Sequence, residues 1–176
     1  MSEKDAHSHL SNPQHIMQDK FQLSFKNLAD TERLIALILG IIFLTVGIAG
    51  FLPQFMALPG NAPVEGVYIP RLSSPDGYGH LFGLFPTNYM HNAVHIVVGL
   101  LGIAAATSFS GALVYNQGFA IVYAAIVLFG LIPATNTTFG LMPIYGNNVW
   151  FNALTGILAA YGGFVKPAEL AKATEA

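Results

Sequence analysis

Four long apolar stretches, separated by turn residues, dominate the pattern of hydrophobic and polar positions along this chain. They cover about 34–52, 87–109, 111–132 and 148–165. An α-helix needs roughly 20 predominantly apolar residues to cross the hydrocarbon core of a bilayer. The pattern therefore predicts an all-α membrane protein with four transmembrane helices.

Residues that cap or interrupt helices mark the ends of these stretches. Asp30 and Thr31 precede the first one and are suited to cap it, and Glu32 adds an acidic residue to its first turn. Pro53 and Pro133 end the first and third stretches, because proline cannot continue a helix. A long connection rich in proline separates the first stretch from the second, and we expect it to form an outer loop.

The distribution of charge divides the chain into three parts. Residues 1–30 are polar and are predicted to be a flexible tail, residues 31–166 form the predicted transmembrane domain, and residues 167–176 form a short polar tail. Basic residues gather near the two ends, at Lys4, Lys20, Lys26, Arg33, Lys166 and Lys172. Because basic residues flank membrane spans on the cytoplasmic side, both tails are predicted to be cytoplasmic.

Composition agrees with the membrane prediction. Only 9% of the residues are charged and 53% are hydrophobic, whereas soluble domains carry about 25% charged residues. Between Gly77 and Val165 there is no Asp, Glu, Lys or Arg. The net charge of −2 gives no reason to expect a nucleic-acid partner. The absence of cysteine excludes disulfides, thiolate metal sites and cysteine nucleophiles.

Two segments repeat the same spacing of turn and helix residues. Gly83-Leu84-Phe85-Pro86 enters the second predicted span, and Gly140-Leu141-Met142-Pro143 enters the fourth. His95 follows the first motif at the distance at which Asn152 follows the second. We therefore expect two helical hairpins of one design, inserted in the same direction and related by a pseudo-twofold axis along the membrane normal.

Polar and small residues form a stripe on each of the two spans that follow these motifs. On the second span, helical spacing places six residues on one face: Asn88, His91, Asn92, His95, Gly99 and Gly102. On the fourth span, the stripe consists of Asn148, Asn152, Thr155, Gly156 and Gly163. Small residues and hydrogen-bonding side chains join helices in membranes. We expect the two stripes to meet, with a hydrogen bond such as that of His95 to Asn152.

His91 and His95 are the strongest candidates for a ligand site. Histidines four residues apart on a helix can bind one metal ion together, and His80, in the turn before the span, could supply a third ligand. Haem held by one histidine and one methionine, or chlorophyll held by one histidine, is a second alternative. The simplest interpretation is that His91 and His95 form structural hydrogen bonds, so we predict no cofactor.

The sequence carries no motif of a known enzymatic mechanism. It contains no Walker loop, no Gly-x-Ser-x-Gly elbow and no His-Glu-x-x-His motif. No Asp or Glu lies within the predicted spans, which excludes a carboxylate proton relay or a di-iron site there. We therefore expect a protein without enzymatic activity.

The pattern Gly-Leu-Phe-Pro-x-Asn-x-x-His-Asn-x-x-His-x-x-x-Gly at residues 83–99 resembles a segment of small four-span bacterial membrane proteins grouped as a domain of unknown function. The likeness includes the segment 47–51 and covers roughly residues 33–165. The resemblance implies a four-span fold in a bacterial inner or thylakoid membrane and implies no activity. In that family the fourth span often carries a histidine where this chain has Asn152.

Three functions are compatible with these patterns. The first is a scaffold or accessory subunit, surrounded by lipid and joined to other membrane subunits or to further copies of itself. The second is a carrier of haem, metal or pigment at His91 and His95. The third is a small transporter with a path between the two hairpins.

Overall fold

The computed structural model describes residues 13–57 and 78–175, and this part of the chain is mostly helical. Its helices are α2 (Pro13–Ala49), α3 (Tyr89–Ala105), α4 (Phe109–Leu131), α5 (Asn147–Ala160) and α6 (Lys166–Glu175). Two short helical turns are η1 (Pro53–Phe55) and η2 (Tyr161–Val165), the latter of π type. The strands are β1 (Met56–Ala57), β2 (Gly79–Leu81) and β3 (Phe85–Thr87).

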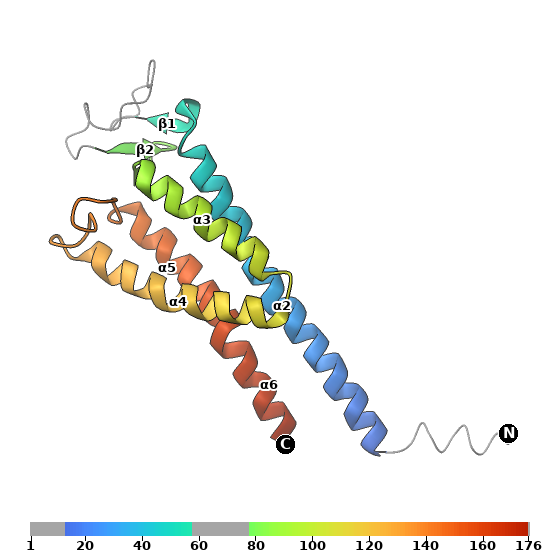
Figure 1. Ribbon diagram of the computed structural model, residues 1–176. Helices are drawn as coiled ribbons and strands as arrows, with labels where there is room; N and C mark the ends of the chain where they lie inside the picture. Colours follow the sequence, from blue (N-terminus) through green and yellow to red (C-terminus); the bar gives the residue numbers. More distant parts are fainter. Residues whose placement is uncertain (1–12, 58–77, 176) are drawn as a thin grey trace, which may run out of the picture.

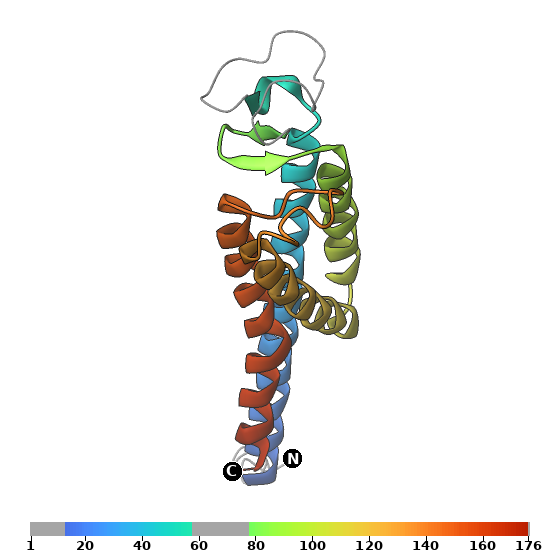
Figure 2. The same cartoon turned by 90° about the vertical axis from the view of Figure 1, so that its left-hand side faces the viewer.

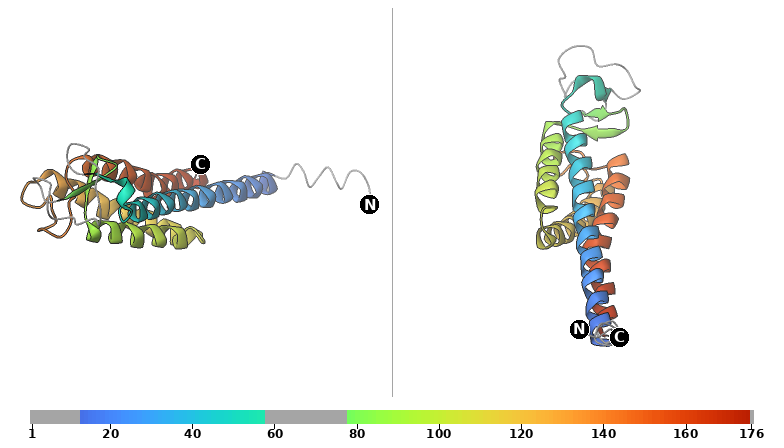
Figure 3. Two further views of the ribbon diagram at one scale, coloured as in Figure 1. Left: turned by 90° about the horizontal axis from the view of Figure 1, so that it is seen from above. Right: turned by 90° about the vertical axis from the view of Figure 1, so that its right-hand side faces the viewer.

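The helices pack around α2, which is the longest element (Figure 1). The carboxyl-terminal part of α2 packs against α3, and α4 packs against α5. The turn η2 continues α5 into α6, which runs beside the amino-terminal part of α2 (Figure 2, Figure 3). The strands lie at one end of the molecule, and the start of α2 and the end of α6 lie at the other.

Each of the helices α2, α3, α4 and α5 overlaps one predicted span, and the ends of the helices differ from the predictions. Helix α2 begins at Pro13, so residues 13–30, predicted as a flexible tail, continue the first helix. Neither Gly nor Pro interrupts the sequence between Gln14 and Leu39. Residues 167–175, predicted as a polar tail, belong to α6. The rest of the predicted amino-terminal tail, residues 1–12, lies outside the described residues.

The prediction of an all-α fold is incomplete, because part of the outer loop forms a three-stranded antiparallel sheet. Met56 pairs with Leu81, and His80 pairs with Pro86 on its other side. Proline is tolerated because β3 is an edge strand and needs no second set of ladder hydrogen bonds. Met56 and Leu81 are buried against Ala49 at the end of α2, so this sheet closes one end of the helical bundle. The loop segment 58–77 lies outside the described residues.

Aromatic rings fill the centre of the bundle. Phe43 of α2 is fully buried. Its ring makes edge-on contacts with the rings of Phe119 and Tyr123, both at a centroid distance of 5.2 Å. Phe119 and Tyr123 stack on each other with centroids 3.8 Å apart. These contacts join α2 to α4, and they bring a large apolar side chain between α3 and α5.

Two helical segments are long and apolar enough to cross a membrane by length and composition. They are Thr31–Ala49 of α2 and Phe109–Leu131 of α4, and α3 is a shorter apolar helix. Neither segment is a wholly enclosed core helix, since 44% of the first and 28% of the second is buried inside the protein. These segments give the structure an apolar character that is consistent with membrane association.

Large apolar side chains lie on the surface of the molecule, and several polar side chains are buried beside its apolar core. Large apolar side chains lie on the outside of α4 and α5, among them Val114, Ile121, Leu131, Trp150, Leu154 and Ile157. The buried polar side chains are Glu32, Thr87, His91, Asn92, His95, Asn116, Asn148, Asn152 and Thr155. Burying amides and imidazoles while exposing leucine is unfavourable in water, because apolar burial drives the folding of soluble proteins.

Glu32 was predicted to lie in the first turn of a helix capped by Asp30 or Thr31, but α2 begins at Pro13, so Glu32 lies within the helix. Its side chain is fully buried, and neither of its carboxylate oxygens has a hydrogen-bond partner. Asn116 of α4 donates from Nδ2 to the main-chain carbonyl of Glu32 at 3.0 Å. Helix α4 packs against α2 beside this residue, the charge of Lys166 acts on its carboxylate, and the apolar segment that starts at Thr31 includes it.

Glu32→Gln is expected to raise the thermal stability of the protein. A buried carboxylate without donors pays a desolvation cost that an uncharged amide reduces, by an amount on the order of 1–3 kcal/mol. Glu169→Gln is the matched control, because Glu169 is exposed and pairs with Lys166 at 2.9 Å on the surface, where an ion pair contributes about 1 kcal/mol at most. Thermal unfolding in detergent measures both variants. A lower midpoint for Glu32→Gln would contradict the prediction.

Candidate functional site

Asn88 fixes the start of α3 and therefore the direction in which its histidines point. Asn88 is the N-cap residue, and its side chain accepts a hydrogen bond from the main-chain N–H of His91 at 2.9 Å. Helix α3 then buries the face that carries His91, Asn92, His95, Gly99 and Gly102. The predicted polar face of the second span is thus the inward face of this helix.

His91 and His95 contact each other inside the bundle. Their Nε2 atoms are 3.0 Å apart, and their ring centroids are 4.3 Å apart. The ring of Phe43 lies edge-on against His95 at 4.9 Å. The Nδ1 atoms of both histidines are buried and make no hydrogen bond of good geometry, and the main chain of Pro143 lies near the ring of His91.

The contact between the two rings has a definite hydrogen-bond chemistry. A neutral imidazole carries one N–H and one bare nitrogen. In two neutral rings joined through Nε2, one Nε2 donates and the other accepts. The donating ring then has a bare Nδ1, and the accepting ring has a protonated Nδ1. The pair therefore offers one acceptor and one donor to anything that reaches the two Nδ1 atoms.

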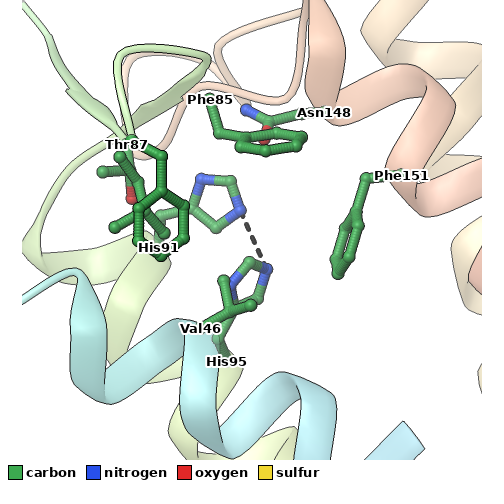
Figure 4. Close-up of a pocket in the computed structure, with 9 residues that line it drawn as sticks. Val46, Phe85, Thr87, His91, His95, Asn148 and Phe151 are labelled. Atoms are coloured by element: carbon green, nitrogen blue, oxygen red, sulfur yellow. Dashed lines mark hydrogen bonds between the residues drawn. The ribbon is translucent and has the colours of Figure 1, made fainter. Parts of the chain in front are cut away.

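A small cavity adjoins the histidine pair (Figure 4). The residues that line it come from α2, the sheet and its turn, α3 and α5: Val46, Leu81, Phe82, Phe85, Thr87, His91, His95, Asn148 and Phe151. The volume of the cavity is about 30 Å³, and one water molecule needs roughly 10–15 Å³. The cavity thus has room for one or two water molecules.

The third predicted ligand, His80, lies in β2 and is not one of the residues that line the cavity. Within residues 13–57 and 78–175, no three His, Cys, Asp or Glu side chains are grouped as metal ligands. The structure therefore brings two of the three candidate histidines together. The strand pairing of His80 with Ala57 and Pro86 explains its separate position.

Asn92 connects the start of α3 to the end of α2. Its Nδ2 donates to the carbonyl of Gly50 at 2.6 Å, and its Oδ1 accepts from the hydroxyl of Thr87 at 2.6 Å. Asn92 is only 1% exposed. Both bonds are therefore made away from water, and they fix the wall of the cavity that Thr87 forms.

Asn148 connects α5 to both of the turns that precede the helices α3 and α5. Its Nδ2 donates to the carbonyl of Pro86 at 2.8 Å and to that of Pro143 at 3.2 Å. Two more amides bond across the same region. Asn88 donates to the carbonyl of Leu141 at 2.8 Å, and Asn147 donates to that of Leu84 at 3.1 Å. The bonds of Asn148 to Pro86, Asn88 to Leu141 and Asn147 to Leu84 join the two halves of the chain next to the histidine pair.

The predicted hydrogen bond between His95 and Asn152 is not formed. His95 pairs with His91 instead, and the ring of Phe151 lies 6.4 Å from the ring of His95. Asn152 is buried on α5. The rings of Phe43 and Phe151 lie between His95 and the middle of α5, so the two polar stripes approach each other only at Asn148, which lines the cavity together with both histidines.

The predicted packing glycines differ in how closely they approach their neighbours. A Cβ atom at Gly99 would lie 2.8 Å from the carbonyl oxygen of Gly40, and one at Gly102 would lie 2.8 Å from the Cα of Gly40. A Cβ at Gly156 would make an ordinary contact of 3.4 Å with Tyr123. Close approach of main chains therefore occurs where α2 and α3 cross.

Phe43 and Phe151 are the residues around the site that sequence patterns did not single out, and the burial of Glu32 elsewhere in α2 was not predicted. Phenylalanine is expected anywhere in an apolar span, so nothing in the sequence marks Phe43 or Phe151 as neighbours of a histidine. The signal for Glu32 was its position directly before the apolar run. Only the packing of the helices shows that this position is buried.

Comparison with known proteins identifies a family and no function. No curated protein matches the chain, and no solved structure matches it. A family model described as a domain of unknown function, DUF4383, matches residues 33–165. This range contains α3 with the histidine pair, α4 and α5 and most of the apolar segment of α2. The chain therefore belongs to the DUF4383 family.

Proposed function

We propose that this protein crosses a membrane four times and serves, without catalysis of its own, as a structural subunit of a membrane assembly. The observation that carries the proposal is the surface of large apolar side chains on α4 and α5, together with the amides and imidazoles among the buried side chains. Lipid is as apolar as leucine, so such a surface is stable in a bilayer, and buried polar groups join the helices. Helix α3 and the continuous rod of α5 and η2 supply the two spans beyond the apolar segments of α2 and α4.

Two similar entry turns support an arrangement as two equivalent hairpins. Phe82 and Gly83 adopt positive φ angles of 54° and 71° in the turn before α3. Phe139 and Gly140 adopt positive φ angles of 56° and 88° in the turn before α5. Non-glycine residues adopt positive φ uncommonly. The same pair of conformations before the same Gly-x-x-Pro motif favours a duplicated design.

Contacts within each pair of helices support the same arrangement. A Cβ atom at Gly50 would collide with the amide of Asn92, which joins α2 to α3. A Cβ at Gly130 would lie 3.0 Å from the side chain of Val149, which joins α4 to α5. Gly50 and Gly130 each stand three residues before a proline, and Asn92 and Val149 each stand six residues after one. Equivalent positions of the two halves therefore make equivalent contacts.

Labelling of single cysteines tests the four-span topology. The chain contains no cysteine, so each introduced thiol is unique. Phe139→Cys, in the exposed connection between α4 and α5, is expected to react with an impermeant maleimide in intact cells. Thr107→Cys, at the opposite turn, and Lys172→Cys, in α6, are expected to react only after the membrane is permeabilised. Labelling of Phe139→Cys and Thr107→Cys from the same side would reject the topology.

Separation of native complexes tests the role as a subunit. The protein extracted in mild detergent from its own membranes is expected to migrate on a native gel at a mass well above that of one chain. Cross-linking and mass spectrometry then identify the neighbours, whether other subunits or further copies. A strictly monomeric protein without cross-linked neighbours would reject the role as a subunit and leave the topology intact.

Binding of a metal ion or small polar molecule by the histidine pair is a second candidate function. It is favoured by two buried Nδ1 atoms that lie beside a cavity and make no hydrogen bond of good geometry. Metal analysis and an absorption spectrum of the protein purified from native membranes test it. A stoichiometric metal or chromophore that is lost in the His91→Ala, His95→Ala double variant would support this function. A colourless and metal-free protein would count against metal and pigment binding.

A further inference from the structure

A groove runs along the outside of the bundle between α3 and α4. Its lining residues are Leu101, Ala105, Ser110, Gly111, Val114 and Tyr115. The groove is shallow and open to the outside. Its walls are mainly apolar and carry no charge, so they suit an apolar occupant.

The groove extends along the helix axes away from the turn that joins α3 to α4. Ala105 and Ser110 lie next to this turn at residues 106–108, whereas Leu101 and Val114 lie about one helical turn farther along their helices. The side chain of Tyr115 reaches across, and its hydroxyl donates to the carbonyl of Val98 at 3.2 Å. The groove therefore spans about one turn of each helix, which is long enough for part of an acyl chain.

Arg33 of α2 lies at the mouth of this groove. Its Nε donates to the carbonyl of Ala106 at 2.9 Å, next to the lining residue Ala105. The side chain of Arg33 is exposed and pairs with no carboxylate in the described part of the chain. Arg33 is also the last charged residue before the long uncharged run of α2. The polar part of α2 therefore ends at Arg33.

We propose that an anionic membrane phospholipid binds here, with an acyl chain in the groove and its phosphate on Arg33. This inference rests on the proposed membrane location. Arginine binds phosphate through parallel N–H groups, and basic residues at the cytoplasmic end of spans attract anionic lipids. The charged Arg33 at the mouth of the groove suits the phosphate of a lipid, and the uncharged walls suit its apolar acyl chain. An apolar helix from a partner would leave the guanidinium without a counter-charge.

Native mass spectrometry of the full chain tests the proposal. The delipidated protein in detergent is offered equal amounts of phosphatidylglycerol and phosphatidylcholine with identical acyl chains. The native protein is expected to retain phosphatidylglycerol in preference to phosphatidylcholine. Arg33→Gln is expected to lower the retention of phosphatidylglycerol about fivefold, the loss expected for one basic residue near a membrane surface. Arg33→Lys keeps the charge and is expected to retain part of the preference.

Three further variants separate the phosphate contact from the groove. Val114→Trp fills the groove and is expected to lower the retention of both lipids, whereas Leu131→Trp adds the same bulk to an exposed position of α4 outside it. Lys172→Gln removes an exposed basic residue on α6 and is expected to change nothing. Size-exclusion profiles and thermal midpoints of all variants verify that they fold.

Three results would overturn the proposal. The first is equal retention of the two lipids by the native protein, which indicates only a general lipid annulus. The second is an unchanged preference in folded Arg33→Gln. The third is a dimer that dissociates in Val114→Trp, which assigns the groove to a second copy. Each of these results is compatible with the labelling pattern of a four-span protein, so the proposal can fail while the topology stands.

Discussion

Gly99→Ala, which adds one methyl group to α3, is expected to cause the largest loss of stability of the substitutions described. A Cβ atom at this position would collide with the main-chain nitrogen of Leu44 and lie 2.7 Å from its Cα and 2.8 Å from the carbonyl oxygen of Gly40. These are main-chain atoms of α2 and cannot move aside as a flexible side chain can. Separation of the two helices is the expected response, at a cost of about 3 kcal/mol, the upper part of the range for overpacking.

The matched control is Gly118→Ala in α4. A Cβ atom at Gly118 would meet nothing within 4 Å, and alanine favours the helix by about 0.5–1 kcal/mol over glycine. Unfolding of both variants in mixed micelles, followed by circular dichroism, is therefore expected to shift in opposite directions. Equal effects at the two positions would mean that the close crossing of α2 and α3 does not determine the stability of the fold.

Asn92→Ala is expected to have the second largest effect. The substitution removes two buried hydrogen bonds of 2.6 Å, to the carbonyl of Gly50 and from the hydroxyl of Thr87. Each lost bond costs about 1 kcal/mol, and each buried partner left without a bond adds a desolvation penalty. We expect a total loss of about 3 kcal/mol, measured by the same unfolding assay.

Asn147→Ala provides the control for Asn92→Ala. Asn147 also donates from its amide to a main-chain carbonyl, that of Leu84 at 3.1 Å, but the bond is exposed. Water or lipid head groups can replace an exposed bond, so the expected loss is below about 1 kcal/mol. If the two variants lose the same stability, burial is not what makes the bonds of Asn92 strong.

Asn92 also links stability to the candidate site. Thr87, which donates to Asn92, lines the cavity beside the histidine pair. Loss of the bond frees the Thr87 side chain and the start of α3 that carries His91. A metal or small ligand held by the two histidines would therefore protect the native protein from unfolding and protect Asn92→Ala less. Binding of a ligand to the folded state alone raises stability in this way.

The order of the helices could be predicted from the sequence because the signals are local. The length of an apolar run and the position of Pro53 act within one segment, and the structure ends α2 at Ala49 and α4 at Leu131, close to the predicted breaks. The inward face of α3 could be predicted for the same reason, since a period of 3.6 residues alone places His91 and His95 together. The sheet was missed because its strands are two or three residues long and come from distant parts of a proline-rich loop.

Apolar runs predicted the helices, and helical spacing predicted the inward faces of α3 and α5. Which inward residues meet depends on the packing of segments that are far apart in the sequence. His95 pairs with His91 within its own helix and not with Asn152, because the rings of Phe43 and Phe151 lie between His95 and the middle of α5. Glu32 is buried because other helices pack against α2 at the start of its apolar segment. Helical periodicity fixes the direction of a side chain, whereas the volume of side chains from distant segments fixes its neighbours.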